Sequence, residues 1–194
     1  MNFSRAALFL ALVVAGCATL PRAQFTGPWN MAELKRAPKA EWGAKSNLTQ
    51  EVYYEGEPFQ GKPTRVFAYL GGPEGKGPFP AMLLVHGGGG QAFANWAQMW
   101  AERGYVALAM DTAGNGPGKV RLPDGGPDQT DAYKFRPFTE ADVKDMWTYH
   151  AVAAVLRGHS LLASLRMWMR TASGSRASVG AATSRASSRA WMTG

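Results

Sequence analysis

Short apolar runs and one helical apolar stripe alternate in the middle of the chain. The run Met82–Val85 is followed at once by His86 and four glycines, which predicts a buried strand that ends abruptly. Apolar residues spaced three and four apart then predict a helix over 93–100. A second apolar run, Tyr105–Met110, ends at Asp111. This order of strand, glycine-rich turn, helix and strand predicts a βαβ unit with two parallel strands in one sheet.

The residues before this unit have a different pattern. Segments 51–54 and 64–70 alternate or run apolar and are rich in β-formers, and the Pro- and Gly-containing stretch 57–63 separates them. They predict an antiparallel hairpin. Residues 25–47 carry Pro28 and Pro38 but also Trp29 and Trp42, large apolar residues that a free linker would not need, so we expect residues 17–47 to be an N-terminal arm packed on the domain.

The clearest helix prediction covers Thr139–Leu165, where apolar residues follow the 3.6-residue period. Asp142 stands three residues after Thr139, which resembles a capping box. Only Gly158 interrupts the stripe. His150 and His159 lie on or beside the apolar face, and we interpret both as half-buried helix residues rather than catalytic groups.

A long Gly- and Pro-rich segment, Ala113–Pro137, follows the second strand of the βαβ unit. Segments in this position border the ligand crevice of open α/β sheets. It carries Asp124, Asp128 and Asp131, whose spacing does not match a calcium-binding EF-hand loop. We therefore interpret them as solvated turn residues, and we expect neither a metal nor a cofactor.

The glycine-rich turn is the candidate for chemistry. Glycines let backbone N–H groups converge near a helix start, where they favour a negative oxygen. Such a turn serves either as a phosphate cradle or as an oxyanion hole, and the glycine spacings of dinucleotide-binding and P-loop motifs are absent here. The predicted oxyanion-hole donors are Gly88 and Gly89, with His86, Gly87 and Gly90 supporting the loop.

The N-terminus has the pattern of an export signal. Arg5 precedes an apolar stretch, Ala6–Ala15, that is too short for a usual membrane span. The following Val14-Ala15-Gly16-Cys17 resembles a bacterial lipobox, in which the cysteine is lipidated. We expect residues 1–16 to be a lipoprotein-type signal peptide, with Cys17 as the lipid anchor in the cell envelope. An ordinary secretory signal is the alternative.

Several stretches together resemble the N-terminal half of an α/β-hydrolase domain, of the acetylxylan-esterase, dienelactone-hydrolase and prolyl-oligopeptidase-like group. The stretches are Arg65–Tyr69, Val85–Gly90, Arg103–Tyr105, Ala109–Asp111 and Asp145–His150. The resemblance spans residues 48–165. It implies a mostly parallel sheet with an antiparallel N-terminal hairpin, an oxyanion loop at the glycines, and then a strand with a G-x-S-x-G nucleophile, an acid and a histidine.

The composition changes at Arg166. Residues 166–194 hold five Arg, six Ser, six Ala and no acid, so this tail carries +5 of the formal net charge of +7. Such a sequence buries too little apolar area to fold, and we expect a disordered tail. A basic nucleic-acid-binding tail is the other interpretation, which an exported protein disfavours; we expect no nucleic-acid partner.

The genetic code offers a third interpretation of the tail. Met167-Trp168-Met169 has a unique codon sequence, which gives Val and Asp when read one base earlier. The same shift permits apolar residues at a run of serine codons and a G-x-S-x-G elbow near 177–182. We therefore predict a frameshift near codon 166 that replaced the nucleophile strand and everything after it, leaving an incomplete domain.

The predicted function follows from the resemblance. It implies a fragment of an exported serine hydrolase acting on small-molecule ester or peptide-like acyl substrates, with the oxyanion loop retained. No nucleophile, acid or catalytic histidine is present in the chain as written, so we expect it to be inactive. A non-catalytic cell-envelope lipoprotein that uses the α/β fold for binding is the alternative.

Overall fold

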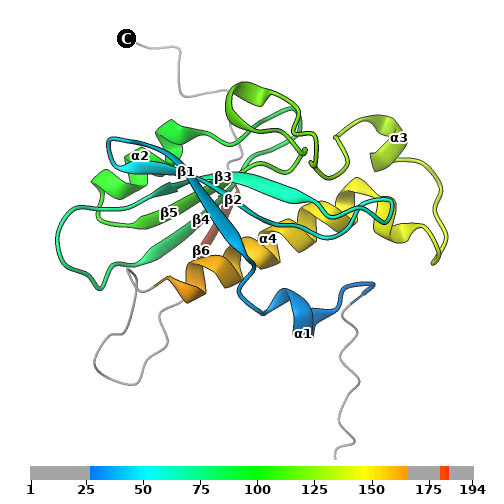
Figure 1. Cartoon of the computed structure of the whole chain (residues 1–194), viewed down its shortest axis with the longest axis horizontal. Coiled ribbons are helices and arrows are strands. Elements are labelled where there is room, and N and C mark those ends of the chain that lie inside the picture. The colour runs from blue at the N-terminus through cyan, green and yellow to red at the C-terminus, as the bar shows by residue number, and fades with distance from the viewer. Residues whose placement is uncertain (1–26, 166–179, 184–194) are drawn as a thin grey trace, which may run out of the picture.

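The computed structural model describes residues 27–165 and the backbone of a four-residue strand at 180–183 (Figure 1). The strands are β1 (Ala40–Ser46), β2 (Thr49–Glu55), β3 (Arg65–Gly71), β4 (Ala81–Val85), β5 (Val106–Met110) and β6 (Gly180–Thr183). The α-helices are α1 (Met31–Leu34), α2 (Ala94–Glu102), α3 (Asp131–Lys134) and α4 (Trp147–Ser164), with 3₁₀ turns η1 (Pro117–Lys119) and η2 (Val143–Asp145).

All six strands form one sheet in the order β1-β2-β3-β5-β4-β6. The predicted hairpin is confirmed as β2 and β3, which pair antiparallel. The predicted βαβ unit is confirmed as β4, α2 and β5, with the two strands adjacent and parallel. The sheet is mixed rather than mostly parallel, because β1–β2, β2–β3 and β3–β5 are antiparallel pairs and only β5–β4 and β4–β6 are parallel. The fold is α/β.

Strand β1 was not predicted, since its residues lie within the expected N-terminal arm. It pairs antiparallel with β2 at the edge of the sheet, where Ala40 is the partner of Tyr54. Five of its seven residues are exposed and none is buried, so no apolar alternation reveals the strand. Trp42, 45 % exposed, lies on this strand. An edge strand held mainly by main-chain hydrogen bonds leaves a weak signature in the sequence.

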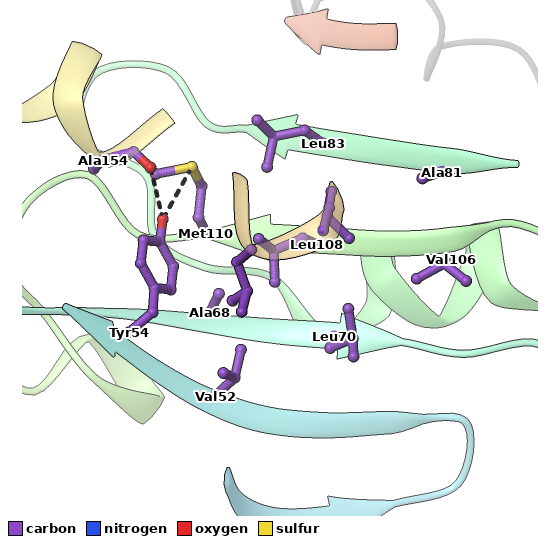
Figure 2. Close-up of a cluster of buried hydrophobic side chains, with 12 residues drawn as sticks. Val52, Tyr54, Ala68, Leu70, Ala81, Leu83, Val106, Leu108, Met110 and Ala154 are labelled. Carbon is purple, nitrogen blue, oxygen red and sulfur yellow. Dashed lines mark hydrogen bonds between the residues drawn. The ribbon is translucent and has the colours of Figure 1, made fainter. Parts of the chain in front are cut away.

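The larger core lies between the sheet and α4 (Figures 1 and 2). Side chains of all the strands from β2 to β5 converge there with those of α4. Tyr54 is fully buried, and its hydroxyl lies 2.9 Å from the carbonyl oxygen of Ala154 and 3.6 Å from Sδ of Met110 (Figure 2). These contacts satisfy the hydroxyl and attach the centre of α4 to β2 and β5.

The opposite face of the sheet is covered by α2. Leu84, Ala107 and Ala109 of the strands pack there against Ala97 of the helix. The helix approaches β3 closely, since a Cβ at Gly71 would fall 2.2 Å from the carbonyl oxygen of Ala97. A glycine at this point of β3 therefore sets the helix–sheet distance.

The predicted helix over Thr139–Leu165 begins later than expected, at Trp147. Asp142 accepts hydrogen bonds from the backbone N–H and the hydroxyl of Thr139, at 2.5 and 2.9 Å, as the capping-box pattern predicts. This local pattern leads only to the 3₁₀ turn η2, because Met146 is extended, with φ −78° and ψ 138°. The prediction of the helix start was wrong because a capping pattern does not ensure that a helix continues.

Gly158 does not interrupt α4, although the apolar stripe breaks there. It faces the core: a Cβ would lie 3.0 Å from the Tyr54 hydroxyl oxygen and 3.3 Å from Cδ2 of Leu108. The gap in the stripe is thus a point of close packing between the helix and the sheet. Gly158, which the sequence pattern marks as an interruption of the helix, is therefore one of its close packing contacts.

Strand β6 corrects part of the expectation for the tail. Gly180–Thr183 runs parallel to β4, with Thr183 the partner of Val85, so the backbone of these four residues of the predicted tail joins the sheet. Backbone pairing with an open strand edge requires no apolar side chains. The rest of 166–194 lies outside the described residues. So do the predicted signal peptide, residues 1–16, and the predicted lipidation site, Cys17. Within the described part of the chain, no helix is long and apolar enough to span a membrane.

Candidate functional site

The candidate site begins where two neighbouring strands end. Val85 and Met110 are partners in the parallel ladder between β4 and β5. The next residues, His86 and Asp111, therefore leave the sheet side by side. Their side chains are 1 % and 2 % exposed, and His86 Nε2 lies 3.6 Å from Asp111 Oδ1. This is the carboxyl end of the parallel strands, where open α/β sheets bind ligands.

His86 links the two strand ends through both ring nitrogens. Its Nε2 accepts a hydrogen bond from the backbone N–H of Thr112, at 3.0 Å. Its Nδ1 lies 2.8 Å from the carbonyl oxygen of Gly87, which can only accept. These two partners assign the neutral tautomer with the proton on Nδ1. The histidine is therefore a structural link that holds the first glycine of the loop.

Asp111 organises the turn after β5. Its Oδ2 accepts from the backbone N–H groups of Ala113 and Asn115, at 2.7 and 2.8 Å. Its Oδ1 is buried and has no hydrogen-bond partner among the described residues. Asp111 and Thr112 line a cavity of about 20 Å³, together with residues that include His150. A polar cavity of this size has room for one water molecule.

The glycine loop after His86 is open to solvent on one side. Gly87, Gly88 and Gly89 are exposed, and a Cβ on any of them would meet nothing within 4 Å. Gly90 is different, because its Cβ would fall 2.6 Å from His86 Nδ1. Packing therefore requires glycine at 90, whereas the first three glycines leave space beside the backbone.

The backbone donors of this loop are in three different states. Gly90 N–H donates within the loop, to Gly87 at 3.1 Å. Gly89, which has φ +72°, donates its N–H to Oε1 of Gln129, at 2.7 Å. Gly88 N–H has no partner among the described residues. Of the two predicted oxyanion donors, one is thus open and the other holds a side chain.

The long segment after β5 lies against the glycine loop, as expected for a segment that borders a crevice. Lys119 donates from Nζ to the carbonyl oxygen of Gly89, at 2.8 Å, and Gln129 Nε2 donates to Thr112 Oγ1, at 3.3 Å. Sequence analysis did not single out Lys119, Gln129 or Thr112. No spacing in the sequence could have found them, because the return path of a long irregular segment has no period.

The three aspartates of this segment have separate local roles. Asp124 pairs with Arg65 Nε at 2.5 Å, and Asp128 accepts from Thr130 N–H at 2.9 Å. Hydrogen bonding from Thr130, first from its side chain and then from its backbone N–H, lowers the pKa of Asp128. Asp131 lies exposed in the first turn of α3. Within residues 27–165, no group of three or more His, Cys, Asp or Glu side chains is arranged to hold a metal ion.

The two helix histidines differ from the expectation that both are half-buried. His150 is 8 % exposed, its Nε2 lies 2.8 Å from the carbonyl oxygen of Lys144, and burial lowers its pKa. His159 is exposed. The helix turns His150 toward the core side and His159 away from it, because nine residues are two and a half turns.

A buried ion pair next to the site was also missed. Arg157 donates from Nη2 and Nε to Glu57 Oε1, at 2.6 and 3.0 Å, and the side chains are 7 % and 14 % exposed. Tyr149 donates its hydroxyl to Glu57 Oε2 at 3.0 Å, and burial, followed by the charge of Glu57, raises the pKa of Tyr149 to about 12. These contacts join the turn between β2 and β3 to α4.

Comparison with solved structures supports the interpretation of the fold. An acetyl xylan esterase from Paenibacillus sp. R4 superposes with a TM-score of 0.51 at 20 % identity, covering 72 % of this chain and 46 % of that one. The fold is esterase-like. A candidate acetyl xylan esterase from Bacteroides fragilis NCTC 9343 matches at TM-score 0.46 and 14 % identity, covering 71 % of this chain and 42 % of its own. The chain spans under half the length of both structures. No family model and no curated protein matches the sequence.

Proposed function

We propose that this chain is the N-terminal part of an exported serine hydrolase that cleaves carboxylic esters or peptide-like acyl bonds. The observation that carries the proposal is the glycine loop at the ends of β4 and β5. It leaves the exposed Gly88 N–H without a partner among the residues that the structure describes, in a fold that is esterase-like. A donor in this position suits the negative oxygen that develops on a carbonyl during acyl transfer.

The chain as written supplies only the half-site that stabilises charge. Attack on an acyl carbonyl also needs a serine, a histidine that takes its proton and an acid that orients the histidine. His86 does not serve as that base, because its Nε2 and Nδ1 both hold backbone groups. Losing nucleophile and base together costs on the order of 10⁶ in kcat. We infer that this chain has no serine-hydrolase activity.

In this proposal, the nucleophile, the acid and the catalytic histidine are encoded by the shifted reading frame that continues from codon 166. The shifted frame places the elbow near 177–182, and the strand before it at positions that lie outside the described residues. The position of β6 beside β4 supports the proposal at a coarser level. It shows that the edge of β4 accepts a further parallel strand, which is where a nucleophile strand could present a serine next to the glycine loop.

A fluorophosphonate probe tests the proposal directly. The 194-residue chain should remain unlabelled, and a gene repaired by one base near codon 166 should yield a labelled enzyme. The matched control is the repaired gene with the elbow serine codon changed to alanine. Labelling of a serine in the unrepaired tail would contradict the inactive fragment, and a repaired protein that stays unlabelled would contradict the hydrolase.

Export and lipid anchoring through Cys17 are a separate part of the proposal, and they rest on the lipobox-like residues alone. Palmitate should label the wild-type chain in cells and should not label Cys17→Ser. Equal labelling would remove the anchor and leave the hydrolase proposal unaffected. A non-catalytic envelope lipoprotein is the outcome if the adjacent frame encodes no G-x-S-x-G elbow.

A further inference from the structure

The glycine loop is closed into a ring by three side chains. Starting at Gly89, its N–H meets Gln129 Oε1 at 2.7 Å, and Gln129 Nε2 meets Thr112 Oγ1 at 3.3 Å. Thr112 Oγ1 then lies 3.2 Å from His86 Nε2, and His86 Nδ1 lies 2.8 Å from the carbonyl oxygen of Gly87. The ring therefore leaves the loop at Gly89 and returns to it at Gly87.

The orientation of Gln129 is fixed by its partners in this ring. Gly89 N–H can only donate, so the Gln129 oxygen must face it and the Gln129 amide nitrogen must face Thr112. Thr112 Oγ1 accepts that hydrogen bond, and it also lies 3.2 Å from His86 Nε2, whose single lone pair accepts from the Thr112 N–H. The proton on His86 Nδ1 goes to Gly87. Reversing the Gln129 amide would set two donors against each other at Gly89, so the loop fixes the orientation of this side chain.

We propose that Gln129 is a positioning residue that occupies the second oxygen subsite of the loop with its own carboxamide oxygen. A ligand oxygen, carboxylate or tetrahedral oxyanion, then meets the Gly88 N–H first and must displace Gln129 to gain the Gly89 N–H. This inference rests on the proposed use of the loop as an oxyanion site. It adds the side chain that controls access to the second donor.

The surroundings of Gly89 support competition for its N–H rather than rotation of the peptide. Lys119 Nζ holds the carbonyl oxygen of Gly89 at 2.8 Å. The loop is exposed, and a Cβ placed on Gly88 or Gly89 would meet no atom within 4 Å. Gln129 is half-buried and makes only two neutral hydrogen bonds. A charged oxygen forms a stronger hydrogen bond than a neutral amide oxygen, so it can replace Gln129.

Titration of the 194-residue chain with acetate, followed through backbone amide resonances, tests the proposal. In the wild type, the Gly88 amide should shift at low acetate and the Gly89 amide only at higher concentration. In Gln129→Ala both should shift together, with acetate binding about threefold to tenfold tighter, the ratio that removal of one competing hydrogen bond implies. Gln129→Glu places a carboxylate in the subsite and should weaken acetate binding below the wild-type level.

Gln98→Ala is the matched control, because Gln98 is half-buried like Gln129 but lies on α2 and donates to Glu102 rather than to the glycine loop. It should bind acetate as the wild type does. Hydrogen exchange provides a readout without ligand: the Gly89 amide should exchange roughly two to ten times faster in Gln129→Ala, the loss of one ordinary hydrogen bond, and unchanged in Gln98→Ala. Unchanged Gly89 exchange, or acetate affinity equal in Gln129→Ala, Gln129→Glu and wild type, would overturn the proposal. Because the unrepaired chain is used, these outcomes are independent of whether a repaired enzyme reacts with fluorophosphonate.

Discussion

Replacing Arg157 with methionine is the sharpest test of how α4 is held to the rest of the fold. The substitution keeps a long apolar side chain but leaves the Glu57 carboxylate, 14 % exposed, with only the Tyr149 hydroxyl. Breaking a buried ion pair from one side typically costs about 3–5 kcal/mol. Because Glu57 retains some contact with water, we expect the lower end, about 3 kcal/mol. At an m value of about 2 kcal/mol/M, the urea midpoint falls by about 1.5 M.

Two comparisons distinguish this mechanism from a general loss of packing. In Glu57→Gln/Arg157→Met both charges are gone, so most of the lost stability should return, since a neutral pair of similar volume costs little to bury. Arg36→Met removes the exposed pair with Glu33, whose side chains are 74 % and 47 % exposed, and should change stability by a few tenths of a kcal/mol at most. Urea unfolding followed by tryptophan fluorescence measures all four chains. A double variant as unstable as Arg157→Met, or an Arg157→Met midpoint equal to that of Arg36→Met, would refute the argument.

Three further predictions concern α4. The pKa of Tyr149 is raised to about 12 in the folded chain, so its contribution to folding stability is complete below pH 10 and is lost as pH rises toward 12. Over that pH range, the stability of the wild type should fall more steeply than that of Tyr149→Phe. Urea midpoints that change in parallel for the two chains would contradict this. Burial lowers the pKa of His150, so folding stability should fall as pH drops below about 6.5, where the unfolded chain takes up the proton. In His150→Gln the stability should depend less on pH in this acidic range. His159→Gln, at an exposed position, should keep the pH dependence of the wild type. Gly158→Leu should destabilise by about 1–3 kcal/mol through overpacking against Tyr54 and Leu108, whereas Val152→Leu on the 40 % exposed face of the same helix should leave the melting temperature unchanged.

The elements that sequence analysis found are those with a strong local period. The βαβ unit and the hairpin have apolar runs or alternation because their strands face the core on one or both sides. Strand β1 has no such pattern, since five of its seven residues are exposed. The apolar stripe of α4 has a gap at Gly158 for a different reason: the position is buried, and the helix packs closely against the sheet there. The spacing of apolar residues indicates which side chains are buried. It does not indicate where the backbone of a helix packs closely against a sheet.

The sequence predicted where the candidate site begins, but it did not predict which residues from other segments complete the site. The glycines and His86 form one local motif, so their place after a buried strand could be predicted. The partners that determine what the motif can bind come from a different part of the chain. Gln129 lies 40 positions from Gly89, and Arg157 lies 100 positions from Glu57. Such pairings depend on how irregular segments return to the sheet, and a single sequence contains no periodic signal for them.

The described contacts of the glycine loop come from one part of the chain. Among the described residues, the groups that contact the glycine loop lie between β4 and Gln129: the strand ends, His86, Thr112, and the segment that returns from β5. None of these contacts involves a residue beyond 129. Bond cleavage requires groups that generate charge as well as groups that receive it. The repaired frame and the acetate titration test these two proposed parts separately, because the titration needs no serine and the labelling needs no acetate.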